Sequence, residues 1–186
     1  SRHPAQRWLL KSPAHLWHLD ALAGEYPDAI IVQTHRDPLK VIASTSALAT
    51  HLRRMASDDP QITEVAAQYR DDIFEGLERG IDARRRNVFP PEHIIDVHFS
   101  TFVAEPIATI REIYAALGRD LSPSTEAAMV RFLSANPGDG GGGGTRYRFA
   151  DTGLDADELR EQAADYQDHF GAVSYTHLTL PTICSV

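Results

Sequence analysis

The apolar residues of the chain form short continuous runs and longer helical stripes, which predict strands and helices in alternation. The segment from Asp28 to His35 is apolar and then turns polar, a pattern typical of a parallel strand buried on both faces. His93 to Phe99 is a second predicted strand. Arg7 to Leu10 is a shorter apolar run, read as a strand that Pro13 stops.

Three- and four-residue spacing of apolar side chains predicts helices between and after these strands. Asp37 is expected to cap the second helix and Pro38 to occupy its first turn. The expected buried stripe of that helix is Val41, Ile42, Thr45 and Leu48. Because strands and helices alternate, the fold class is α/β, a parallel sheet with flanking helices. The predicted helices cover residues 13–24, 38–55, 62–86, 107–117, 125–133 and 155–170.

Composition narrows the choice of ligand more than the choice of fold. The 186 residues are 42% hydrophobic and 24% charged, as in an ordinary globular domain. The net charge of −8 repels nucleic acid, so a phosphate-bearing ligand requires a local cluster of donors. The single cysteine, Cys184, excludes a disulfide framework and a cysteine metal site, which is compatible with a cytoplasmic protein.

Both ends of the chain depart from an ordinary domain. Ser1 is followed almost at once by apolar Trp8, as if a strand had been cut from its context, so we interpret the chain as amino-terminally truncated. No charged residue occurs from Gly171 to Val186, a stretch too short and too polar to span a membrane. We expect residues 1–171 to form a partial domain and 172–186 to be a non-native or disordered tail. A genuine edge strand is the alternative.

The segment from Thr34 to Ser44 carries the most informative chemistry. It places Arg36 at the carboxyl end of a predicted strand and Ser44 two turns into the following helix. A guanidinium offers a fixed fork of donors to a phosphate, and ligands of open α/β sheets bind outside the carboxyl ends of strands. The alternative is that Arg36 pairs with Asp37 or with another surface acid.

An arginine followed eight positions later by a serine, across a strand-to-helix junction, resembles the 3′-phosphate-binding motif of sulfotransferases. The resemblance runs from about Arg7 to Gly171, and its quoted segments are Leu10–Leu16, Tyr26–Ala29, Tyr147, Asp151, Gly153–Asp155 and Phe170–Gly171. It implies a P-loop-like sulfotransferase fold. It also implies 3′-phosphoadenosine 5′-phosphosulfate as the sulfuryl donor, an acceptor hydroxyl or amine, and no metal.

The resemblance also implies roles for individual residues. Arg36 and Ser44 match the donor's 3′-phosphate site, and Arg146 is a weaker candidate there. Lys11 matches a lysine beside the transferring sulfuryl group. His15 lies near a catalytic histidine of cytosolic members, but their pattern is Lys-x-His and here it is Lys-x-x-x-His. The family's phosphosulfate-binding loop has no counterpart, because the glycine run 138–144 lacks a following Lys-Ser or Lys-Thr, so the chain alone is expected to be inactive.

Two other functional classes stay open at the level of the sequence. One is a non-catalytic nucleotide-binding or interaction module that keeps the sheet without the chemistry. The other is a phosphotransferase of similar architecture, which requires a nucleoside triphosphate site and a magnesium-binding acid. The acceptor, whether a small molecule, a glycan or a peptide, and the oligomeric state are not readable from the residues. No nucleic-acid partner is expected.

Overall fold

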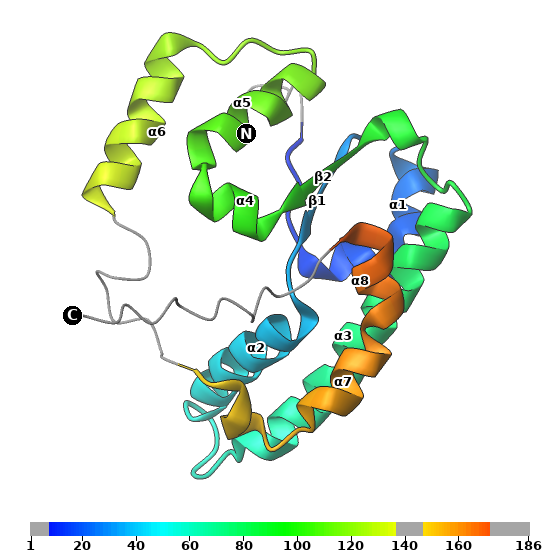
Figure 1. The fold of residues 1–186 in the computed structure, drawn as a ribbon, viewed down its shortest axis with the longest axis vertical. Coiled ribbons are helices and arrows are strands. Elements are labelled where there is room, and N and C mark those ends of the chain that lie inside the picture. The colour runs from blue at the N-terminus through cyan, green and yellow to red at the C-terminus, as the bar shows by residue number, and fades with distance from the viewer. Residues whose placement is uncertain (1–7, 137–146, 172–186) are drawn as a thin grey trace, which may run out of the picture.

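A two-stranded parallel sheet lies at the centre of the protein in the computed structural model, which describes residues 8–136 and 147–171. Strand β1 is Ile31–His35 and strand β2 is Ile94–His98. They pair in register from Ile31 opposite Ile94 to His35 opposite His98. Figure 1 shows them side by side, with their carboxyl ends at one edge of the sheet. The predicted parallel pairing is confirmed, and it brings the two polar strand ends together.

The helices follow the predicted order, with three differences. The predicted first helix begins as a 3-10 helix over Pro13–His18 before it becomes α-helical. Helix α4, directly after β2, was not expected, and the predicted last helix is broken at Ala163 into two short helices. The chain contains 3-10 turns η1 (Pro13–His18), η2 (Pro91–His93) and η3 (Phe149–Thr152). The α-helices are α1 (Leu19–Glu25), α2 (Pro38–Arg53), α3 (Ile62–Arg85), α4 (Phe99–Ala104), α5 (Pro106–Ala116), α6 (Pro123–Ala135), α7 (Ala156–Gln162) and α8 (Ala164–Phe170).

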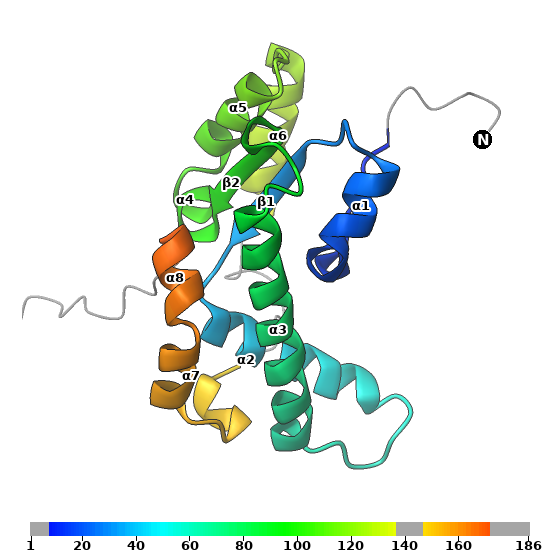
Figure 2. The same cartoon turned by 90° about the vertical axis from the view of Figure 1, so that its right-hand side faces the viewer.

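The two faces of the sheet are covered unequally. Helices α1, α3 and α8 lie on the face that carries Ile31 and His35, where Figures 1 and 2 show α8 beside the long helix α3. On the other face α4 and α5 pack against β2, and Ile30 and Val32 are 44% and 43% exposed. The expectation that the first strand is buried on both faces is therefore wrong, because no described element covers its second face.

The apolar run before Pro13 does not form the predicted strand. Residues 8–12 have no regular structure, and Trp8 and Leu9 are 74% and 95% exposed. A strand needs backbone hydrogen-bond partners on a neighbouring strand, and within the described residues β1 pairs only with β2. Local apolar character is thus not sufficient here to fix an extended segment.

Helix α2 buries a different stripe from the one predicted. Ile42 is fully buried as expected, but Leu48 is 59% exposed, whereas Ala43, Ser46 and Ala47 are buried. The helix contacts α3 and η3, and its buried face includes these small side chains, which allow close approach of neighbouring backbones. A stripe chosen by hydrophobicity alone overlooks them.

Some sequence expectations fall on residues that the structure does not describe. The glycine run 138–144, Arg146 and the segment 172–186 lie outside the described ranges. Among the helices that are described, none combines the length and the apolar character that crossing a membrane requires.

Candidate functional site

The turn between β1 and α2 is buried except at Arg36. His35 is 2% exposed, Asp37 is 6% exposed, and Pro38 is also buried. Arg36 alone of these four residues is partly exposed. The sequence therefore places one long cationic side chain in a turn whose other residues face the protein interior.

Asp37 anchors the start of α2 in two ways. Its carboxylate accepts a hydrogen bond of 3.1 Å from the Leu39 backbone N–H, which caps the helix as predicted. It also accepts bonds from both terminal nitrogens of Arg160, at 3.2 and 3.3 Å. Because Asp37 is held by Arg160 of α7, it is not the partner of Arg36.

Arg36 meets aromatic side chains instead of a carboxylate. Its Nη2 donates a hydrogen bond of 2.9 Å to the hydroxyl of Tyr147, and its Cζ lies 4.5 Å from the ring centroid of Phe99. Within the described residues Arg36 has no acidic partner. The alternative that it pairs with Asp37 or with another surface acid is therefore not observed. The other partly buried arginines all pair with carboxylates: Arg70, Arg84 and Arg160. The positive charge of Arg36 is therefore left uncompensated by the described part of the chain.

Ser44 lies on the same strand-to-helix unit, two turns into α2, and is partly exposed. It shares a helix face with Ala47 and His51, which stand three and seven positions further on. Those two residues and Tyr147 line a cavity of about 160 Å³. No hydrogen bond among the described residues joins Ser44 to Arg36, so their common site stays a prediction.

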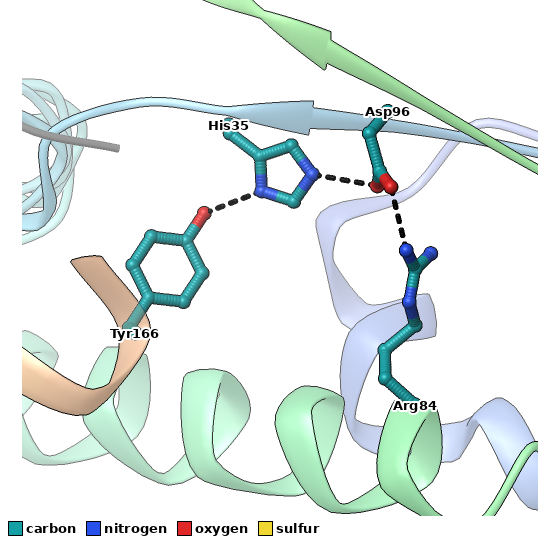
Figure 3. A network of polar contacts seen from close by, with 4 residues as sticks. All are labelled: His35, Arg84, Asp96 and Tyr166. Carbon is teal, nitrogen blue, oxygen red and sulfur yellow. Dashed lines mark hydrogen bonds and ion pairs between the residues drawn. The ribbon is translucent and has the colours of Figure 1, made fainter. Parts of the chain in front are cut away.

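A chain of hydrogen bonds runs behind the turn, on the other side from Arg36. His35 on β1 lies between Tyr166 of α8 and Asp96 of β2 (Figure 3). Its Nδ1 is 2.9 Å from the Tyr166 hydroxyl, and its Nε2 is 2.8 Å from one carboxylate oxygen of Asp96. Arg84 of α3 donates to the other carboxylate oxygen at 2.5 Å. Residues of β1, β2 and α8 therefore meet at one imidazole ring, and α3 is joined to them through Arg84 and Asp96.

The electrostatics of this network favour a single protonation state. Burial lowers the pKa of His35, and this outweighs the opposing effect of the Asp96 carboxylate. Burial acts to raise the pKa of Asp96, but the bonds from His35 and Arg84 lower it overall. Burial, followed by the nearby charge of Asp96, raises the pKa of Tyr166. Asp96 is thus ionised and paired with Arg84, whereas His35 and Tyr166 are neutral.

The remaining predicted site residues are not part of these contacts. Lys11 is exposed in the irregular segment before η1, and His15 is partly buried within η1. No described hydrogen bond or ion pair links either of them to Arg36. Arg146 lies outside the described residues, directly before Tyr147. Their roles therefore stay predictions.

Sequence reasoning missed His35 and Asp96 as members of the site. Both were assigned to strands without a role of their own. A polar residue inside an otherwise apolar strand was the available signal, because such a group is buried only with a partner. The partners could not be identified, since Tyr166 lies 131 residues from His35 in the sequence.

Comparison with known proteins identifies the family and the fold. A profile described as the sulfotransferase family matches residues 1–123. The structure is similar to sulfotransferase STF9 from Mycobacterium avium, with 28% identity and a TM-score of 0.75 over 88% of this chain. It is also similar to sulfotransferase STF1 from Mycobacterium tuberculosis H37Rv, with 32% identity and a TM-score of 0.67 over 86% of this chain. No curated protein matches.

The chain spans 41% and 40% of the lengths of these two solved proteins. The predicted fold class is confirmed, because both neighbours are sulfotransferases and the described sheet is parallel with helices around it. The profile match covers well over half of the 186 residues. The chain belongs to the sulfotransferase family, a family of transferase enzymes, and carries part of its P-loop-like fold.

Proposed function

We propose that this chain supplies the 3′-phosphate side of the donor site in a sulfotransferase that uses 3′-phosphoadenosine 5′-phosphosulfate. Arg36 would hold the 3′-phosphate, with Ser44 and Arg146 as further donors. The reaction would transfer a sulfuryl group to an acceptor hydroxyl or amine on a small molecule, glycan or peptide, and release adenosine 3′,5′-bisphosphate. No metal is required by this scheme.

The uncompensated charge of Arg36 is the observation that carries the proposal. A guanidinium bonded to a phenol retains its full positive charge, whereas the other partly buried arginines are neutralised by carboxylates. A charge-assisted bidentate bond to phosphate is stronger than a neutral hydrogen bond. In a chain of net charge −8, such a local donor is what an anionic nucleotide needs.

Lys11 and His15 are proposed to act on the sulfuryl group and the acceptor. As the bond between sulfur and the bridging phosphate oxygen breaks, negative charge grows on that oxygen, and the ammonium of Lys11 would stabilise it. A neutral imidazole at His15 would accept the proton of the acceptor hydroxyl as its oxygen bonds to sulfur. Lys11 is exposed and His15 is partly exposed, so a ligand could reach both side chains.

Calorimetric titration of the chain with two nucleotides tests the 3′-phosphate assignment. Adenosine 3′,5′-bisphosphate should bind more tightly than adenosine 5′-monophosphate, which lacks the 3′-phosphate. Arg36→Ala should weaken only the bisphosphate, by about ten- to a hundredfold, the range for loss of one charge-assisted contact of roughly 1.5–3 kcal/mol. Arg119→Ala, at an exposed position, is the control. Equal affinity for both nucleotides, or an unaffected Arg36→Ala variant, would contradict the proposal.

A further inference from the structure

The polar network behind the turn is placed where it can set the position of the proposed phosphate ligand. His35 and Arg36 are adjacent, and β1 ends at His35. Successive residues of a strand point to opposite faces of the sheet. His35 faces α3 and α8, whereas Arg36 contacts Phe99 and Tyr147. Any rotation of the backbone at His35 would therefore displace Arg36 as well.

We propose that His35 is a positioning residue for Arg36: held at both ring nitrogens, it fixes the carboxyl end of β1 so that Arg36 is oriented before an anion arrives.

The ring of His35 has one orientation that satisfies all its neighbours. An ionised carboxylate only accepts, so Nε2 must carry the proton and donate to Asp96. Nδ1 is then the acceptor, and the Tyr166 hydroxyl donates to it. The ring also stacks on Phe170, with centroids 4.2 Å apart and planes inclined by 25°. Turning the ring over would break both hydrogen bonds, so the side chain is locked.

The pairing of the two strands links the fixed His35 ring to the side of the sheet on which Arg36 lies. His35 pairs with His98, so the next residues along each strand direction are Arg36 and Phe99. The guanidinium of Arg36 lies over the Phe99 ring, so the residues that directly follow the two paired strand ends are in contact. Asp96, which holds His35, belongs to the same strand as His98. The network therefore fixes both strands whose ends flank Arg36.

Pre-orientation of Arg36 has a measurable consequence for binding. An arginine side chain that is ordered before binding loses less conformational entropy when the anion arrives. Loss of the network should release Arg36 without removing its charge. The expected effect on the affinity for an anion is roughly three- to tenfold, the cost of ordering one long side chain.

The first test needs no ligand, and so does not depend on the proposed function. The Nε–Hε signal of Arg36 in ¹⁵N NMR is assigned from its loss in Arg36→Lys. In the unaltered chain its heteronuclear NOE should match that of the α2 backbone. In Tyr166→Phe, which removes one hydroxyl but keeps the ring, and in His35→Gln, the value should fall toward that of exposed Arg119.

A destabilising variant in another hydrophobic cluster, which removes none of the four network side chains, separates positioning from stability. Phe89 is 3% exposed and packs with Leu19 and Ala83 in a different cluster. Phe89→Leu should lower the melting temperature and leave the Arg36 NOE unchanged. The inference is overturned if the Arg36 NOE is unchanged in Tyr166→Phe and His35→Gln. It is also overturned if Phe89→Leu lowers the Arg36 NOE as much as Tyr166→Phe or His35→Gln does, when the variants lose the same amount of melting temperature.

The second test rests on the proposed function and measures the dissociation constant of adenosine 3′,5′-bisphosphate. Tyr166→Phe should raise it roughly three- to tenfold in the unaltered background. In the Arg36→Ala background the Tyr166→Phe substitution should not change the dissociation constant further, because Tyr166 acts through Arg36. Additive effects would overturn the positioning role. Absence of bisphosphate binding by the unaltered chain would contradict the proposed function alone, since the NMR test still decides the role of His35.

Discussion

At the scale of single residues, the turn between β1 and α2 separates two kinds of charged group. Asp37 and Asp96 are each held by an arginine, Arg160 and Arg84 respectively. Arg36 is held by a phenol and an aromatic face. Neither of these neutralises it, because the hydrogen bond and the cation–π contact leave the net charge in place. The local arrangement therefore combines an ordered backbone with an available cation.

His35 should make the stability of the chain depend on pH. The groups that face it are Asp96, Arg84, His98 and Tyr166. Burial lowers the pKa of folded His35 below its ordinary 6.5, so the unfolded chain takes up a proton first as the pH falls. The contribution of neutral His35 to the free energy of unfolding is fully present above about pH 6.5 and decreases below that pH. The decrease is at most about 1.4 kcal/mol per pH unit, until the folded pKa is reached.

Thermal denaturation between pH 8 and pH 5 measures this dependence. His35→Gln should reduce the fall in melting temperature over that range, because glutamine does not titrate. The unaltered chain, measured over the same range, is the reference. An identical pH dependence in the unaltered chain and in His35→Gln would rule out His35 as its source.

At the scale of helices and turns, the contact between α3 and η1 depends on two glycines. A Cβ at Gly76 would lie 2.5 Å from the ring of Trp17, and one at Gly80 would lie 2.6 Å from the end of Leu16. Alanine favours a helix over glycine by about 1 kcal/mol. The rigid indole cannot yield as a leucine can, so Gly76→Ala should destabilise the chain by about 1–2 kcal/mol net.

Urea unfolding of matched alanine variants checks this close approach. Gly80→Ala should cost less than Gly76→Ala, because Leu16 can change its rotamer. Gly24→Ala in α1 is the control, since a Cβ there meets nothing within 4 Å. It should be neutral or stabilise by up to about 1 kcal/mol. Equal stability of the Gly76 and Gly24 variants would show that η1 does not rest on α3 as described.

Elements with strong local signals were predictable from the sequence. The cap at Asp37 with the proline at Pro38 marked the start of α2, and helix α3 was expected within one residue of its end. Properties that depend on neighbours were not predictable. The exposed face of β1 and the irregular segment 8–12 follow from which elements cover them. The break at Ala163 separates two helices that share one apolar side, so periodicity alone did not reveal it.

The candidate site also contains residues that the sequence predicts and residues that it does not. Arg36 was identified from its position at a strand end, and the structure places it in a buried turn with its charge uncompensated. The network of His35, Asp96, Arg84 and Tyr166 was not foreseen, because its members come from four elements. Pairing between elements distant in the sequence is a property of packing, which a local pattern does not encode.

At the scale of the whole molecule, this chain spans about two fifths of its solved relatives. A full-length sulfotransferase built on it would separate the roles proposed for Arg36 and Lys11. Arg36→Ala should raise the KM for the donor, because the 3′-phosphate is the same in the ground and transition states. Lys11→Ala should mainly lower kcat, because charge on the bridging oxygen grows only during transfer.

Steady-state kinetics with a phenolic or alcohol acceptor measure both constants. Each change is expected to be about ten- to a hundredfold, for one charge-assisted contact of roughly 1.5–3 kcal/mol. Arg131→Ala, at an exposed position of α6, provides a matched loss of one positive charge. Equal effects of both site variants on kcat, with the donor KM unchanged, would overturn the assignment of the two roles.

The bond between His35 and Tyr166 also sets the earliest time at which the proposed site can reach its final geometry during synthesis. These residues are 131 positions apart, and ribosomes add roughly 5–20 residues per second, so Tyr166 follows His35 by about 7 to 26 seconds. During that interval a nascent chain has Arg36 but not the helix that locks the residue before it. The pre-orientation proposed for Arg36 would therefore be completed only after α8 has left the ribosome, so a nascent chain should bind a phosphate more weakly than the finished one.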